Sequence, residues 1–165
     1  MAHELRIERL IDAPVELVFD TFCDPDLQAE IHGEGQPGWV IHKAETDVRV
    51  GGTSTYQMGA EGQEPDTEIR RFTVVERPHR LEFAHHMIVP SEDLSLETEM
   101  TITFEDRDGK TLVTFVQGPF ERVEDRDGFT EGWREMLAAL DRVTREGLKA
   151  RHDTEGVEAS DERGA

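Results

Sequence analysis

Hydrophobic and polar residues alternate through most of the middle of the chain, which is the pattern of strands with one buried face. The alternation is clearest over 94–106, where Leu96, Met100 and Phe104 share one face and glutamates and threonines occupy the other. Successive strand residues point to opposite faces, so one side of the predicted sheet contacts solvent. Seven segments are predicted to be strands: 4–11, 39–48, 53–59, 68–76, 80–89, 94–106 and 111–117.

Two short helices are predicted directly after the first strand. Asp12 and Pro14 are residues typical of a helix start, and apolar residues follow at helical spacing over 15–22. A second start at Asp24 opens another short helix, which ends where glycines accumulate over 33–38.

The longest helical pattern covers 127–149 and ends the predicted domain. Its apolar residues recur at three- and four-residue steps and form one stripe: Phe129, Trp133, Met136, Leu137, Leu140, Val143 and Leu148. The following residues are polar and lack periodicity. We therefore expect one domain over residues 1–149 and an acidic, disordered tail over 150–165.

This order of elements predicts an α+β fold of the form β-α-α-β6-α. A curved seven-stranded antiparallel sheet with one long C-terminal helix must pack the helix against its concave face to bury both apolar surfaces. Where the sheet curls strongly, the helix and the sheet separate and leave a central cavity. Apolar cavities of this kind are where small ligands bind.

Five segments, taken in order, resemble those of a known superfamily: 11–19, 24–27, 47–52, 74–83 and 132–133. The chain resembles the START-like (SRPBCC, Bet v 1-like) helix-grip proteins, in the branch related to the C-terminal domain of the activator of Hsp90 ATPase (AHSA1-like). The resemblance implies a hydrophobic cavity under the C-terminal helix. The superfamily includes lipid carriers, polyketide cyclases, hormone receptors and resistance proteins, so the fold does not choose a function.

The chain departs from this branch at the end of the second helix. The family often carries Trp-Trp-Gly there, whereas this sequence has Ile31-His32-Gly33 and its nearest tryptophan is Trp39. We therefore expect the mouth of the cavity to be wider or differently polar.

The charge balance excludes some classes of partner. The 165 residues include 37 acidic and 18 basic side chains, for a formal net charge of −19. Such a chain repels phosphate backbones and anionic lipid, so we expect neither nucleic-acid nor membrane binding. With no targeting segment or apolar span in the sequence, we expect a cytoplasmic protein.

The sequence also lacks the usual patterns of metal and cofactor chemistry. The single cysteine, Cys23, can form neither an internal disulfide nor a thiolate zinc site, and its place in a helix predicts a small buried side chain. The chain contains no His-Glu-x-x-His, no Gly-x-Ser-x-Gly and no phosphate-binding glycine loop. We expect no metal and no cofactor.

His85 is the one candidate for chemistry, as a general base. If the strand over 80–89 turns Leu81, Phe83, His85 and Met87 inward, then His85 enters the cavity and His86 faces solvent. His85 is then either a hydrogen-bonded histidine of the cavity wall or a ligand anchor or general base.

Further candidates for ligand contact come from the other inward faces. Gln117 is a hydrogen-bonding candidate at a strand end, Tyr56 can pack or orient a ligand hydroxyl, and His32 is expected to be a loop histidine. Among titratable residues, only the histidines are good candidates for catalysis. The predicted ligand-binding set is Ile31, His32, Trp39, Tyr56, Met58, Phe83, His85, Met87, Phe115, Gln117, Trp133, Met136, Leu137 and Leu140.

The sequence leaves three functions open. The first is binding of a small hydrophobic molecule, lipid-, polyketide- or aromatic-like, in the cavity. The second is a cyclase or dehydratase acting on a polyketide-like substrate, with His85 as general base. The third is a co-chaperone-like interaction module, although we do not expect an Hsp90-type partner because the chain lacks the domain that accompanies this one in the eukaryotic activator. A homodimer is left open.

Overall fold

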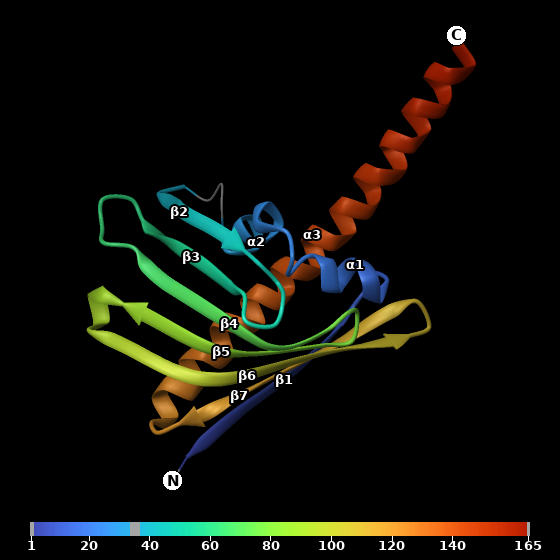
Figure 1. Cartoon of the computed structure of the whole chain (residues 1–165). Helices are drawn as coiled ribbons and strands as arrows, with labels where there is room; N and C mark the ends of the chain where they lie inside the picture. The colour runs from blue at the N-terminus through green and yellow to red at the C-terminus, as the bar shows by residue number, and fades with distance from the viewer. Residues whose placement is uncertain (1, 34–36, 165) are drawn as a thin grey trace.

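The computed structural model describes residues 2–33 and 37–164, with side chains described up to residue 146. Its elements, in chain order, are β1 (His3–Ile11), α1 (Val15–Asp20), α2 (Pro25–Ile31), β2 (Trp39–Thr46), β3 (Thr53–Ala60), β4 (Asp66–Glu76), β5 (Arg80–Val89), the short 3₁₀ helix η1 (Pro90–Glu92), β6 (Leu94–Arg107), β7 (Lys110–Phe120) and α3 (Val123–Gly164). The predicted order of strands and helices is confirmed, and Figure 1 shows the sheet curving around α3.

The sheet has seven strands in the order β1-β7-β6-β5-β4-β3-β2. Every neighbouring pair is antiparallel, as predicted. The register places Arg70 of β4 beside His85 of β5, and His85 beside Thr98 of β6. Three polar residues from separate strands therefore lie in one row across the sheet.

Two turns depend on glycine. In the hairpin between β6 and β7, Asp108 and Gly109 both have positive φ, 54° and 87°, as a two-residue type I′ turn requires. Before β3, Gly51 has φ 83°, and a Cβ built on Gly52 would lie 2.3 Å from the carbonyl oxygen of Asp47. Only glycine fits at position 52 without moving the backbone.

The main core lies between α3 and one side of the sheet. The stripe on α3 is buried at Trp133, Met136, Leu137, Leu140 and Val143. The helix contacts β1, β7, α1 and α2 most extensively. The inner faces of β3, β4 and β5 therefore curve away from α3, and space remains between them.

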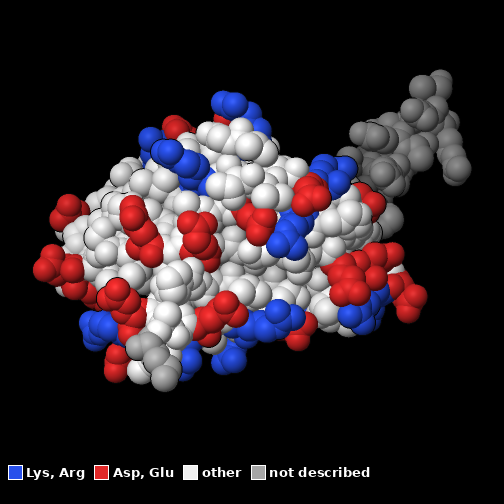
Figure 2. Space-filling model, turned by 60° about the horizontal axis from the view of Figure 1, so that its bottom comes forward, with Lys and Arg blue, Asp and Glu red and all other residues white. Residues whose placement is uncertain are grey.

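The surface carries the acidic excess. Figure 2 shows acidic side chains spread over one face with fewer basic ones between them.

Cys23 is exposed, so the prediction of a buried cysteine is wrong. It follows the end of α1 and lies outside the buried face formed by Val15, Val18 and Phe19. Partial burial, helped by the charge of Asp20, raises the pKa of the Cys23 thiol to about 11. Among the described residues, no helix is long and apolar enough to cross a bilayer.

The predicted tail coincides with the last part of α3. The helix continues to Gly164, whereas the sequence predicts disorder over 150–165; the side chains from 147 onward, including predicted stripe residue Leu148, lie outside the described residues. The sequence past Ala150 lacks an apolar stripe to hold a helix against the domain, so we expect unprotected amides in hydrogen exchange. Slow exchange across 157–163 would contradict the disordered tail.

Candidate functional site

A cavity of about 760 Å³ lies between α3, the end of α2, and the inner faces of β3, β4 and β5. This volume is within the usual range of small-molecule sites, roughly 300–1,000 Å³. Of the predicted ligand-binding set, the cavity wall contains Ile31, His32, Trp39, Met58, His85, Met87, Trp133 and Met136. The remaining predicted residues are buried but do not border on the cavity: Tyr56, Phe83, Phe115, Gln117, Leu137 and Leu140.

Glu68 of the cavity wall belongs to a buried ion pair that sequence analysis missed. Glu68 and Arg70 occupy successive inward positions of β4, with exposed fractions of 4% and 1%. The Arg70 Nε donates a short hydrogen bond to Glu68 Oε1. The signal was present in the sequence, because both residues share the inward face of β4 with Phe72. Charged residues at such positions are buried only when paired.

Arg70 is held by aromatic rings as well as by its acid. The four rings within 6.0 Å of its guanidinium carbon belong to Phe22, Tyr56, Phe83 and Trp133. The Arg70 Nη1 also donates to Gln28 Oε1 at 3.2 Å, and Gln28 Nε2 in turn donates to the backbone carbonyl of Thr21 at 3.0 Å. Cation–π contact and hydrogen bonding together compensate part of the cost of burying this charge, while Arg70 Nη2 has no hydrogen-bond partner among the described residues.

His32 lies in the turn after α2, as expected of a loop histidine, and its side chain belongs to the same polar cluster. Its Nδ1 lies 2.6 Å from the backbone carbonyl oxygen of Gln28, and its Nε2 lies 3.5 Å from Glu68 Oε2. Its ring stacks on Tyr56 with centroids 4.9 Å apart. Both ring nitrogens of His32 therefore face acceptor oxygens.

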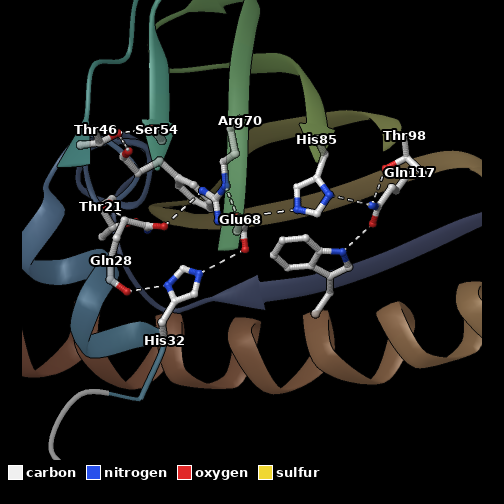
Figure 3. Close-up of polar contacts among 12 residues, drawn as sticks. Thr21, Gln28, His32, Thr46, Ser54, Glu68, Arg70, His85, Thr98 and Gln117 are labelled. Atoms are coloured by element: carbon white, nitrogen blue, oxygen red, sulfur yellow. Dashed lines mark hydrogen bonds and ion pairs between the residues drawn. The ribbon is translucent and has the colours of Figure 1, made fainter. Parts of the chain in front are cut away.

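The orientation of His85 is fixed through two other residues (Figure 3). The Trp133 indole can only donate, and its Nε1 lies 2.6 Å from Gln117 Oε1, which sets the orientation of the Gln117 amide. Gln117 Nε2 therefore donates to Thr98 Oγ1 at 2.8 Å and to His85 Nδ1 at 3.4 Å. Since Nδ1 accepts, this network assigns the proton of neutral His85 to Nε2.

This assignment determines what His85 can offer the cavity. The residue is 1% exposed, borders on the cavity, and its Nε2 has no hydrogen-bond partner among the described residues. The nearest acid oxygen, Glu68 Oε1, is 3.7 Å away, beyond hydrogen-bonding distance. His85 therefore presents an N–H donor, and no lone pair, at Nε2.

Gln117 has a different role from the one predicted. Its side chain is fully buried, and both ends of the amide are already bonded, to Trp133 and to Thr98 and His85. No hydrogen-bonding capacity of this amide is directed at a ligand. Gln117 is a positioning residue for His85.

The charge state of the site follows from its contacts. Burial raises the pKa of Glu68, but the Arg70 guanidinium and the nearby His32 and His85 rings outweigh it and hold that pKa well below its ordinary value. Glu68 is thus ionised at neutral pH. It is a third titratable group in the cluster, beside His32 and His85. Within the described part of the chain, no three His, Cys, Asp or Glu side chains are arranged to hold a metal ion.

Comparisons with known proteins agree on the fold. The family model described as Activator of Hsp90 ATPase homolog 1-like protein matches residues 12–145. A crystal structure from Rhizobium loti has a TM-score of 0.73 at 21% identity, covering 87% of this chain and 97% of that one. A crystal structure from Mycobacterium smegmatis gives 0.68 at 22% identity, covering 88% and 90%. The solution structure of an AHSA1-like protein from Aeromonas hydrophila gives 0.69 at 23% identity, covering 88% and 94%. No curated protein matches the chain.

Proposed function

The chain belongs to the family of activator of Hsp90 ATPase homolog 1-like proteins, and from this premise we propose that it binds a small hydrophobic molecule in the cavity under α3. The wall of the cavity supplies the apolar contacts, with Met58, Met87 and Met136 among them. Methionine side chains adapt their shape to a ligand at small cost. Binding energy in this proposal comes mainly from burial of the apolar body of the ligand.

The observation that carries the proposal is the unpartnered Nε2–H of His85. A buried donor left without an acceptor costs about 1–3 kcal/mol, and native structures rarely retain one without a reason. An oxygen atom of a ligand, in a carbonyl, hydroxyl or ether group, would accept this hydrogen bond. The proposed ligand therefore has an apolar body and an oxygen that reaches His85.

Replacing His85 with alanine tests this contact. With decanol as a neutral probe, we expect the dissociation constant to rise about twofold to tenfold, the worth of one net hydrogen bond. Isothermal titration calorimetry measures the change. His86→Ala is the control, because His86 bonds Ser95 at the surface of the sheet, at 2.8 Å, and should change affinity by less than about twofold. Equal affinities for wild type and His85→Ala would refute the hydrogen bond to His85.

The enzymatic alternative finds less support in this geometry. A general base needs a free lone pair toward the substrate, and the network around Gln117 turns the lone pair of neutral His85 away from the cavity. An enzyme using His85 as base would lose about a hundredfold or more in turnover in His85→Ala while binding stays nearly intact. A loss of affinity without such a turnover effect supports the binding function. If neutral apolar probes do not enter the cavity at all, the protein-interaction alternative becomes the leading one.

A further inference from the structure

Unpaired carboxylates border the proposed ligand cavity. We define the acidic rim as Asp66, Glu92, Asp125 and Glu135, all of which contribute to the cavity wall and are half-buried or exposed. None of them has a basic side chain within 4.0 Å among the described residues. The described part of the wall contains no lysine or arginine. The potential at the mouth is therefore strongly negative.

Ordinary structural roles explain only part of this charge. Glu124, another acid of the wall, pairs with Arg122 at 3.6 Å. Asp125 lies in the first turn of α3, where a negative charge interacts favourably with the helix N-terminus. Among the described residues, Asp66, Glu92 and Glu135 have no basic partner, and none of the three lies in the first turn of α3. Burial, together with the nearby charge of Glu92, raises the pKa of Asp66.

Two features independent of the acids indicate that this cavity receives a ligand. The first is His85, which lines the cavity and whose buried Nε2–H has no hydrogen-bond partner in the part of the chain that the structure describes. The second is the aromatic content of the same wall, with Trp39, Phe129 and Trp133. Aromatic faces attract cations such as alkylammonium groups, most strongly where water is excluded.

We propose that the ligand of this cavity is a cationic amphiphile, an amine or quaternary ammonium compound whose positive group lies at the acidic rim while its apolar body, with the oxygen that accepts from His85, enters the cavity. This inference rests on the proposed function and narrows its ligand class. A carboxylate ligand such as a fatty acid would instead bring its charge close to four unpaired acids and would be repelled. The acidic rim thus selects against anionic lipids of the same apolar shape.

Three probes with the same alkyl chain separate these possibilities: decylammonium, decanol and decanoate. Titrated into the full chain below their aggregation concentrations, they differ only in the head group. Decylammonium alone has no oxygen for His85, so an advantage over decanol reports its positive charge. We expect decylammonium to bind roughly tenfold more tightly than decanol, and decanoate to bind more weakly than both. The preference for decylammonium should shrink as sodium chloride is added, because the rim is partly open to solvent.

A pair of double variants assigns the preference to the rim. Asp66→Asn/Glu92→Gln should abolish most of the advantage of decylammonium over decanol. Glu97→Gln/Glu99→Gln removes the same formal charge from solvent-facing positions of β6, outside this cavity, and should leave the advantage unchanged. Equal binding of decylammonium and decanol by wild type would overturn the cationic ligand but leave the proposed function standing. If none of the probes binds, both are overturned.

Discussion

Replacing Arg70 with methionine is expected to lower the free energy of unfolding by about 3–5 kcal/mol, the usual cost of removing one partner from a buried ion pair. The variant leaves ionised Glu68 buried without its guanidinium, and it removes the cation from the surrounding aromatic rings. Urea unfolding at pH 7 measures the loss. Arg71→Met is the matched control, since Arg71 is the next residue of β4 and exposed, and should cost less than about 0.5 kcal/mol.

The pH dependence of the same variant identifies the cause. In wild type the folded-state pKa of Glu68 is lowered, so its stabilising contribution is present above its unfolded pKa and is lost as the pH falls through the folded value. In Arg70→Met, burial raises the pKa instead, and protonation of Glu68 relieves the penalty. The stability difference between the two proteins should therefore be smaller at pH 4 than at pH 7. The double variant Glu68→Leu/Arg70→Met should recover most of the loss; a difference independent of pH would contradict a buried charge as the cause.

Filling the cavity should prevent binding altogether. Met136 is 7% exposed, belongs to the stripe of α3 and borders on the cavity, so Met136→Trp would project a larger ring into the space of the ligand. We expect no measurable binding of decanol by calorimetry, with a folding cost of roughly 1–3 kcal/mol or less. Ala138→Trp is the control, because Ala138 is exposed on α3 and lies outside the cavity wall. Unchanged binding by a folded Met136→Trp variant would show that the probe occupies another place.

The architecture was predictable because local patterns specify it. Alternation indicated the strands within a few residues, and Asp24 accepts hydrogen bonds from the backbone amides of Asp26 and Leu27, as the predicted helix start requires. The hairpin at Asp108-Gly109 also forms as its dipeptide predicts. Each of these features depends on residues that are close in sequence.

The polar cluster was not predictable in the same way. Glu68 and Arg70 can be buried only because three polar side chains contact them. These are Gln28 from α2, His32 from the C-terminal end of α2, and His85 from β5. No local sequence pattern indicates these long-range contacts. The alternation of β4 did place the two charges on the inward face. What the pattern lacked was the set of partners that makes their burial possible.

The functions assigned to single side chains were the least predictable. The alternation of β5 indicated that His85 faces inward, and the structure agrees, but its tautomer depends on Trp133 acting through Gln117. These hydrogen bonds connect α3, β7 and β5, which are far apart in the sequence and come together only in the folded structure. Without it, His85 could equally have been a base, which is why the sequence alone did not separate the binding and catalytic hypotheses.

The most direct test of the cavity as the ligand site uses the two tryptophans of the chain, Trp39 and Trp133, both of which line it. In a ¹⁵N-labelled sample their indole N–H groups give two resolved reporters inside the proposed site. On titration with decanol, we expect both indole signals to shift and saturate together, and we expect Met136→Trp to abolish the effect on Trp39. Saturation of the protein with decanol while both indole signals stay in place, and only surface amides near exposed Leu10 or Val50 move, would contradict the cavity as the binding site.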